Sequence, residues 1–536
     1  MRNYRWQTIS LFILVSMFGI ECSKENVLAP DVNAPSYIGD LSVVSTTNGS
    51  ATLTWTAPGD DGDQGRAAHY DVRYATVPIT DENWEFALQA VGEPSPLAVG
   101  ETELFTVRGL EPGVDYFFAV QAADEVHNWS GLSNLEGVRT ALYRNGEGTW
   151  QVPHDTGTIQ EAIDVASPGD TVLVSSGTYY EHNIHMKSGI VLMSETGEAD
   201  CVIIDAEQAG RVMYCQDIDE TTVIRGFTFT NGDLDRMMNG AGLYCDSSSP
   251  QIINCAFTGN KATGHGGGIQ CTFQSSPRIV NCTFTGNEAK GHGGGISCMY
   301  ASSPRIDGCT FTDNNVRCHG GAISIITSSA PELIDCIFTD NSAMGEGGAI
   351  SCTSGASPTI IRCTFGGNST HGMGGAIGCS SDATPNLSYC VFARNVSNHG
   401  AAMSFSSSSP VITNCTFAHN VANLGAVLLS DASFAEIRNT IIAYNTGSTV
   451  RILDGAPPLF YCSDIFGNSE GDWTGCIEFQ SGLEDNFSAD PQFCGEGYPD
   501  ESYGLKDSSP CAPANSPSNE LVGALPVACT GSLQYK

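Results

Sequence analysis

Apolar and polar residues alternate through the middle of this chain in a pattern that returns every 27 residues. In the unit that starts at Pro250, apolar side chains stand at Ile252, Cys255 and Phe257, and the next unit repeats them 27 residues later. Alternation over so few residues predicts short strands with one buried face, and the intervening Gly-Gly, Ser-Ser-Pro and Thr-Gly-Asn segments predict turns. We therefore expect three short strands separated by turns in each 27-residue unit.

A unit of this size cannot bury its apolar face alone, so the units are expected to stack into an all-β solenoid. Layers about 4.8 Å apart let each strand pair with its equivalent in the next layer, and like residues then lie on like. One column is predicted to fill the core, at Phe257, Phe284, Phe311, Phe338, Phe365, Phe392 and Phe417. A second is predicted to pass amide hydrogen bonds from layer to layer, at Asn260, Asn287, Asn314, Asn341, Asn368, Asn395, Asn420 and Asn445.

Cysteines follow the same period, although 21 cysteines in a secreted chain would otherwise indicate disulfides. One column occupies Cys255, Cys282, Cys309, Cys336, Cys363, Cys390 and Cys415, and another occupies Cys245, Cys271, Cys298, Cys352 and Cys379. Stacked side chains point in parallel, which strains a disulfide, so we expect mostly free, buried thiols. The expected disulfide partners, in an unknown pairing, are Cys201, Cys215, Cys462, Cys476, Cys494, Cys511 and Cys529.

The repeat resembles the right-handed parallel β-helix of the pectate-lyase-like superfamily. Its motifs F-x-x-N, as in Phe257 to Asn260, and G-G-[AG]-I, as in Gly266 to Ile269, are also similar to repeats of chlamydial polymorphic outer-membrane proteins. This second resemblance covers residues 240 to 445. Both resemblances imply a right-handed parallel β-helix and neither names a reaction, because one fold hosts many functions.

The limits of the β-helix follow from a predicted cap and from the loss of the repeat. Residues 158–166 read as a short helix with a capping box at its start, and irregular coils are expected over 171–231. We assign 150–485 to the β-helix and 486–536 to a closing segment, which resembles that of related bacterial proteins. Residues 142–149 are the expected linker to the preceding domain.

Residues 35–141 form a different domain, which resembles a fibronectin type III β-sandwich. Sandwich-like spacing is carried by Trp55, by the strand from Tyr70 to Tyr74 and by a later segment that ends at Tyr116. Tyr116 stands where that family has its tyrosine corner. The resemblance implies a spacer or an adhesion module.

Residues 1–22 predict a secretion signal, because Arg2 and Arg5 precede an apolar run that is too short to span a membrane. Cys22 and the Ser-Lys-Glu that follows resemble the start of a mature bacterial lipoprotein, so Cys22 is the candidate lipidation site. Glu21 departs from the small residue that this family has before its cysteine. We expect a protein that is secreted or held on the outer surface of a bacterial cell, with membrane contact only through such an anchor.

The formal net charge of −36, from 59 acidic and 23 basic residues, narrows the choice of partners. Nucleic acids and anionic membranes are poor partners for such a surface. Strongly anionic polymers are repelled as well, unless Ca²⁺ bridges them to the protein. Ca²⁺ is therefore the cofactor that we consider, and we expect the protein to be a monomer.

One polar column precedes the Gly-Gly turn, at His265, His292, His319, Glu346, Met373 and His399. Histidines one layer apart can bind a transition metal or share a proton. With the basic position two residues earlier, the catalytic candidates on this hypothesis are His292, His319, Glu346 and Arg317. The alternative is a tolerant turn position, which the presence of Met373 favours.

A second polar column precedes the asparagines and places Asp313 and Asp340 one layer apart. Such a pair can hold Ca²⁺ or shift one carboxyl pKa for acid–base chemistry, and the alternative is that aspartate is simply a good turn residue. Glycosidases use two placed carboxylates. Pectate lyases, which this fold resembles, use Ca²⁺, acidic residues and a basic residue.

A third acidic group lies in the fibronectin-like domain, in the Gly-rich loop 58–65. Its Asp60, Asp61 and Asp63 are candidate Ca²⁺ ligands, and the alternative is an acidic turn exposed to solvent.

Serine, threonine and asparagine dominate the expected outward faces of the coils, and such faces suit hydrogen bonding to sugars. We expect a secreted or cell-surface protein that binds polysaccharide or a partner surface, as an adhesin or scaffold. The alternative is a polysaccharide lyase or glycoside hydrolase that acts on an extracellular glycan. The sequence leaves open whether the protein is an enzyme.

Overall fold

The computed structural model of the chain describes residues 33–47, 49–111, 113–140, 148–235, 238–495 and 503–529. The predicted secretion signal, Cys22 and most of the predicted linker lie outside these residues. The chain divides into two compact units, residues 1–142 and 143–536. Among the described residues, no helix has both the length and the apolar character needed to cross a membrane.

The first unit is a sandwich of two antiparallel sheets, as the sequence predicted. One sheet contains β1 (Ser42–Thr46), β2 (Ser50–Thr56) and β5 (Thr102–Arg108), and the other contains β4 (Leu88–Gln89), β3 (His69–Ala75), β6 (Asp115–Ala123) and β7 (Glu136–Arg139). Trp55 is buried between them, with its ring edge-on to Tyr70 at 5.1 Å. The hydroxyl of Tyr116 accepts a hydrogen bond from the backbone N–H of Glu111 at 3.1 Å, which is the predicted tyrosine corner.

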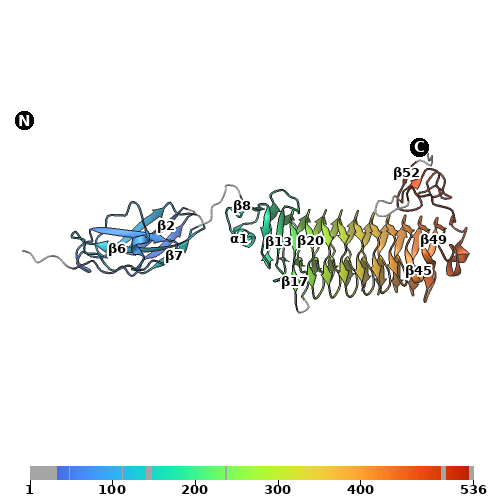
Figure 1. Ribbon diagram of the computed structural model, residues 1–536, viewed down its shortest axis with the longest axis horizontal. Helices are drawn as coiled ribbons and strands as arrows, with labels where there is room; N and C mark the ends of the chain where they lie inside the picture. The colour runs from blue at the N-terminus through green and yellow to red at the C-terminus, as the bar shows by residue number, and fades with distance from the viewer. Residues whose placement is uncertain are drawn as a thin grey trace, which may run out of the picture. The chain divides into compact units, whose positions relative to one another are not determined.

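The second unit is a parallel β-solenoid whose coils stack along one axis (Figure 1). One coil contains β22 (Ile269–Thr272), β23 (Arg278–Val280), β24 (Thr283–Thr285) and β25 (Glu288–Ala289). The three sheets have 13 strands from β8 (Thr149–Val152) to β49 (Leu459–Tyr461), 12 from β10 (Gly177–Tyr179) to β50 (Asp464–Phe466), and 18 from β11 (Ile184–His185) to β48 (Thr446–Ile452). The prediction of three strands per coil was wrong by one, because a two-residue strand such as β25 is too short to show alternation.

The predicted columns form the core of the solenoid. The phenylalanine rings from Phe229 to Phe417 are fully buried and stack with centroids 4.6–5.0 Å apart and interplanar angles of 3–7°. The asparagines form a continuous ladder, in which the side-chain oxygen of Asn314 accepts the backbone N–H and the side-chain amide of Asn287 at 3.1 and 3.0 Å. This ladder continues past Asn445 to Asn468, one coil further than predicted.

The cysteine columns lie inside the coils, and their thiols are free. Cys215 pairs in register with Cys245, so the prediction that Cys215 lies outside the columns was wrong. The coil between Cys215 and Cys245 is longer than 27 residues, so the 27-residue spacing did not predict this pairing. Its neighbours over 171–231 are irregular in length, yet their strands pair in register with the coils that follow. One disulfide forms among the described cysteines, between Cys494 and Cys529. The prediction of disulfide partners was wrong for Cys201, Cys462, Cys476 and Cys511, whose thiols are free.

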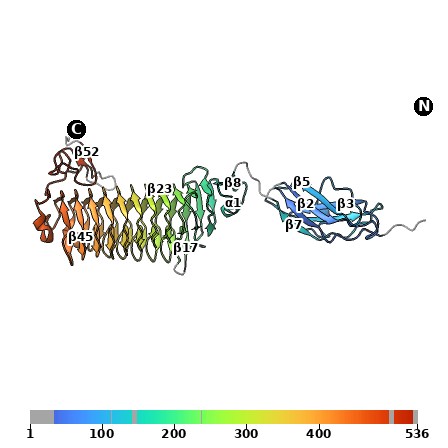
Figure 2. The ribbon, with the colours of Figure 1, turned by 180° about the vertical axis from the view of Figure 1, so that it is seen from behind.

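A short helix covers the first coil, and the chain after the last coil folds back along the side of the stack. Helix α1 (Ile159–Val165) buries Ile159 and Ile163, and its N-cap Thr158 accepts a hydrogen bond from the N–H of Glu161 at 3.1 Å. The closing segment, with β51 (Leu505–Lys506) and β52 (Val527–Cys529), packs on the outer face of the 12-stranded sheet. Both ribbon views show it beside the last coils (Figure 2).

Candidate functional site

A shallow groove of about 240 Å³ crosses four consecutive coils on the 18-stranded sheet. It is built on the two-residue strands β17 (Asp233–Leu234), β21 (Lys261–Ala262), β25 and β29 (Asn315–Val316). Side chains alternate along a strand. The second residue of each strand therefore packs inward, in the apolar cluster of Leu234, Ala262, Ala289 and Val316, and the first points into the groove. The register of the solenoid thus lines up one polar side chain per coil.

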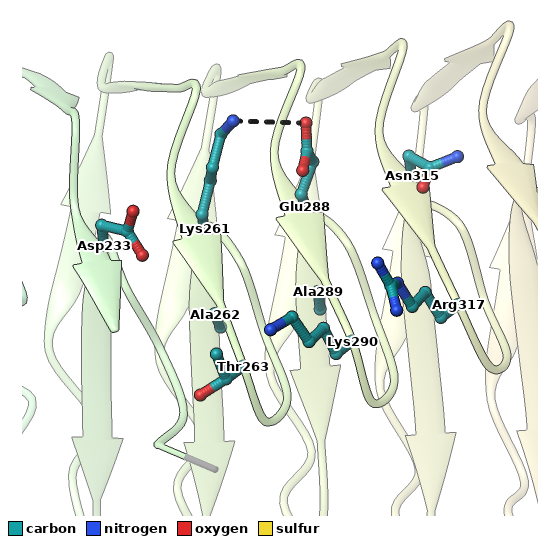
Figure 3. A pocket seen from close by; sticks show the side chains of 9 residues that line it. All are labelled: Asp233, Lys261, Ala262, Thr263, Glu288, Ala289, Lys290, Asn315 and Arg317. Atoms are coloured by element: carbon teal, nitrogen blue, oxygen red, sulfur yellow. Dashed lines mark ion pairs between the residues drawn. The ribbon is translucent and has the colours of Figure 1, made fainter. Parts of the chain in front are cut away.

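The groove carries both signs of charge. Lys261 Nζ lies 3.6 Å from Glu288 Oε1, and both side chains are about half exposed, so this ion pair contributes at most about 1 kcal/mol. Figure 3 shows this pair above Lys290 and Arg317, which come from the turns that follow β25 and β29. Neither Lys290 nor Arg317 has an ion pair with any described residue. Their charges are therefore available to a ligand in the groove.

Next to this basic column, the turns that precede the Gly-Gly pairs stack three imidazoles. The rings of His265, His292 and His319 lie parallel, with centroids 5.0 and 5.2 Å apart. The Nδ1 of His265 accepts the backbone N–H of His292 at 3.0 Å, and the Nδ1 of His319 accepts that of Glu346 at 2.8 Å. An Nδ1 that accepts a backbone hydrogen bond carries no proton, so these two imidazoles are neutral with the proton on Nε2. The histidine column therefore stabilises the backbone of the turns that precede the Gly-Gly pairs.

Glycine is required beside each accepting imidazole. A side chain at Gly291 would place its Cβ 2.5 Å from the Nδ1 of His265, and one at Gly345 would lie 2.6 Å from the Nδ1 of His319. The coil above His292 has Cys318 at this position instead of glycine. The buried Nδ1 of His292 correspondingly has no hydrogen-bond partner among the described residues. The ladder of accepted N–H groups is therefore interrupted at His292.

Burial favours the neutral form of His265 and His292. It lowers the pKa of His265, and burial together with the neighbouring His265 and His319 lowers the pKa of His292 to about 4. The unfolded chain, with an ordinary histidine pKa of about 6.5, takes up the proton first as the pH falls. The stability that the neutral ladder contributes is thus present above about pH 6.5 and is lost as the pH falls toward the folded pKa.

We expect His292→Gln to reduce the acid sensitivity of the β-helix. The urea midpoint should fall less between pH 7.5 and pH 5 in the variant than in the parent chain, because one group that must stay neutral has been removed. His371→Gln, at an exposed position of the same unit, is the matched control and should leave the pH difference unchanged. Equal pH differences in all three proteins would contradict this account of the ladder.

The structure places Asp313 and Asp340 on successive coils, as predicted, at turn positions with φ of 56° and 55°. Glycines occupy the same left-handed position in coils below and above, at Gly286 and Gly367. Burial, and then the charge of Asp313, raise the pKa of Asp340. Asp313 precedes strand β29 and Arg317 follows it, so the acidic pair and the basic column lie at opposite ends of this strand.

The Ca²⁺ candidates Asp60, Asp61 and Asp63 lie on a tight loop, where the backbone N–H groups of Asp60 and Asp61 donate to the carbonyl of Gln64 at 2.6 and 3.1 Å. Burial, and then the adjacent Glu125, raise the pKa of Asp60. No group of three or more His, Cys, Asp or Glu side chains within the described ranges is arranged to hold a metal ion. The role of these aspartates stays a prediction.

Sequence reasoning found Arg317 but missed Asp233 and Lys261, which line the same groove. The sequence did contain a signal for this groove. Two residues after each buried asparagine stands an apolar residue that packs inward, so the residue between the two must point outward. That position carries Lys261, Glu288 and Asn315 in successive coils. Reading it as a column would have located the groove.

Comparison with known families matches both units. Residues 188–365 and 375–476 match the family described as "Right handed beta helix region", and residues 33–133 match the fibronectin type III domain. Calcium-activated chloride channel regulator 1 of Equus caballus is 34% identical over 123 residues, which is 22% of this chain and 14% of that protein. The protein of the same name from Homo sapiens is 34% identical over 124 residues, 22% of this chain and 13% of that protein. The chain therefore spans a small part of the length of these relatives.

Matches to solved structures have low sequence identity and low TM-scores. The family 28 exopolygalacturonase of Yersinia enterocolitica is 13% identical, with a TM-score of 0.23 over 80% of this chain and 98% of that one. The A-module of the mannuronan C-5 epimerase AlgE6 of Azotobacter vinelandii is 13% identical, with a TM-score of 0.34 over 62% of this chain and 95% of that one.

Proposed function

The chain belongs to the family of proteins with a right-handed β-helix region, and from this premise we propose that it binds an extracellular polysaccharide along the groove of Lys290 and Arg317. The observation that carries the proposal is the presence of two unpaired basic side chains on neighbouring coils of a very acidic chain. Coils about 4.8 Å apart present one side chain per layer, a spacing close to the rise per sugar of an extended polysaccharide. A polymer that follows the axis meets a new side chain at each coil.

The charge of these residues favours an acidic polysaccharide. The net charge of −36 repels such a polymer at long range, but salt screens charges beyond about 8 Å at physiological ionic strength. Within the groove, a bound carboxylate therefore meets the charges of Lys290 and Arg317, the Lys261–Glu288 pair, and Asp233 at one end. Arg317 can hold a carboxylate through two parallel hydrogen bonds.

We expect removal of both charges, in Lys290→Gln with Arg317→Gln, to weaken binding of polygalacturonate or alginate by at least roughly tenfold. The reason is that a hydrogen bond to a charged group contributes about 1.5–3 kcal/mol. Calorimetric titration with and without Ca²⁺ measures the effect. Arg278→Gln, on an exposed position of the 13-stranded sheet, is the matched control. Unchanged affinity in the double variant would exclude the groove as the binding site.

The same groove supports a second candidate, a polysaccharide lyase or glycoside hydrolase, because it brings Glu288 and Asp233 close to two cations. Glu288 would be the acid–base group and Arg317 the residue that neutralises a substrate carboxylate. Release of unsaturated or reducing ends from the bound polymer would favour this candidate over simple binding. The absence of such products from every polymer that the groove binds would exclude it.

Fibronectin type III and β-helix domains are both typical of extracellular proteins. We propose that the protein acts outside the cell. A monomeric state, and a spacer or adhesion role for the first unit, stay predictions. Bacterial origin and a lipid anchor at Cys22 stay predictions, since Cys22 lies outside the described residues.

A further inference from the structure

The outer face of the 12-stranded sheet carries a regular array of threonines. Successive strands here are β16 (Thr228–Thr230), β20 (Ala256–Thr258), β24, β28 (Thr310–Thr312), β32 (Ile337–Thr339) and β36 (Thr364–Gly366). The central phenylalanine of each strand points into the core, so the residues on either side of it point outward. One outward column is Thr228, Ala256, Thr283, Thr310, Ile337 and Thr364, and the other is Thr230, Thr258, Thr285, Thr312, Thr339 and Gly366.

The array is flat and evenly spaced. The phenylalanines beneath it, from Phe229 to Phe365, stack 4.6–5.0 Å apart with interplanar angles of only 4–7°. Adjacent strands of an ordinary sheet are rotated by about 20–25°, whereas the side chains beneath this face keep almost the same orientation from coil to coil. Along a strand, two outward residues such as Thr283 and Thr285 lie about 6.6 Å apart. The face is thus a two-dimensional lattice of side chains.

The hydroxyl groups of this lattice differ in whether they bond to the protein. Those of Thr228 and Thr230 donate to backbone carbonyls, at 2.7 and 2.9 Å. Seven further hydroxyls make no hydrogen bond to any described residue: those of Thr258, Thr283, Thr285, Thr310, Thr312, Thr339 and Thr364. Because threonine is branched at Cβ, its χ1 angle is restricted and the array is held rigid.

Charge and covering distinguish this part of the face from the rest of the molecule. Neither threonine column contains a charged residue between Thr228 and Gly366, although the chain has 59 acidic residues. In later coils the same outward positions become apolar, at Val391, Ala393 and Ala418, and the closing segment covers them with Tyr503 and Ala524. At the other end of the face, Glu198 and Asp200 line a hollow together with Thr283. The bare, hydroxyl-rich and uncharged area therefore extends from Thr285 to Thr364, between this hollow and the part that the closing segment covers.

We propose that this threonine face binds the surface of an ice crystal. Its two spacings lie close to the repeats of water oxygens along the a and c axes of hexagonal ice. Methyl groups order the water above them, hydroxyl groups hydrogen-bond it in register, and the rigid, uncharged lattice matches a rigid, uncharged surface. The face lies on a different sheet from the Lys290 and Arg317 groove, so this activity is independent of polysaccharide binding.

The test is thermal hysteresis of the full chain in a nanolitre osmometer, with the shape of the growing crystal recorded. We expect the parent chain to show a hysteresis gap and faceted crystals. Thr285→Tyr with Thr312→Tyr should abolish both, because two bulky rings lift the ice plane off the array. Thr359→Tyr, on the outer face of the 13-stranded sheet, should retain both. Far-ultraviolet circular dichroism and the urea midpoint verify that each variant is folded.

A milder variant covers the case in which the tyrosine variant does not fold. Thr285→Ser with Thr312→Ser keeps the hydroxyls and removes two methyl groups, and it should narrow the hysteresis gap. The absence of hysteresis and faceting in the parent chain overturns the proposal, as does full hysteresis in either folded double variant. Adsorption to crystalline cellulose or chitin through this face, without ice shaping, also overturns it and identifies a flat polysaccharide as the occupant.

Discussion

Replacing Asn314 with alanine is expected to lower the free energy of unfolding of the β-helix by about 3 kcal/mol or more. The Asn314 side chain is fully buried and accepts both the backbone N–H and the side-chain amide of Asn287, while it donates to the carbonyl of Phe284 at 2.9 Å. Alanine removes the bond to each of these three groups, although the side-chain amide of Asn287 keeps its bond to the carbonyl of Phe257 at 2.8 Å. Each buried group left without a partner costs about 1–3 kcal/mol. The defect lies in mid-stack, so it weakens both neighbouring interfaces.

The adjacent Asn315 provides the control, because it is the same residue type with an exposed side chain that donates to Ser342 Oγ at 2.6 Å. Asn315→Ala should cost less than about 1 kcal/mol, as is usual for surface hydrogen bonds and substitutions. Urea unfolding followed by circular dichroism compares the two midpoints. Similar midpoints for both variants would show that the ladder does not carry the stability assigned to it.

Phe311→Ala is expected to have an effect of similar size, about 3–5 kcal/mol. The Phe311 ring is fully buried between Phe284 and Phe338, at centroid distances of 4.6 and 4.8 Å, and the coil spacing set by the backbone prevents these neighbours from closing the gap. The substitution therefore leaves a cavity as well as removing apolar surface from the core.

Phe273→Ala separates stacking from burial. Phe273 also stacks on an aromatic neighbour, Tyr300, at 5.1 Å, but it is 52% exposed at a turn. Its loss should cost about 1 kcal/mol or less, which is the range for an exposed aromatic pair. If Phe273→Ala shifts the urea midpoint as far as Phe311→Ala does, stacking rather than core burial dominates the stability of the columns.

The repeat made the core predictable, because a fixed period places like residues on like. Asn260 to Asn445 and Phe257 to Phe417 therefore stand where the sequence predicted them. Cys215 and the two-residue strands were missed, because unequal coil lengths and very short strands weaken the periodic signal. The docking of the closing segment was also missed, although the change from threonine to Val391 and Ala393 on an outward face already signals a cover.

The candidate site was less predictable for a different physical reason. The column of Arg317 could be read from the sequence, but whether an imidazole such as His319 points a donor or an acceptor at its neighbour depends on turn geometry. The structure shows an acceptor, so His319 stabilises the backbone of the next turn. A catalytic role for the histidines stays a prediction. The two aspartates were placed on successive coils correctly, but their distance from Arg317 depends on strand β29, which the sequence did not reveal.

The near identity of the coils leaves the folding chain with competing alignments. From Asn260 to Asn395 each coil is 27 residues long, so a slip by one whole coil still sets phenylalanine on phenylalanine and asparagine on asparagine. Ion pairs between coils resist such a slip, because the partners of Lys261–Glu288, Arg305–Glu332 and Asp335–Arg362 meet only in the native alignment. These exposed pairs add little to the stability of the finished fold, yet they penalise its mispaired competitors. The two ends of the stack differ from its middle, because helix α1 covers the first coil and the coils after Asn395 have other lengths. These ends fit only one alignment of the coils between them.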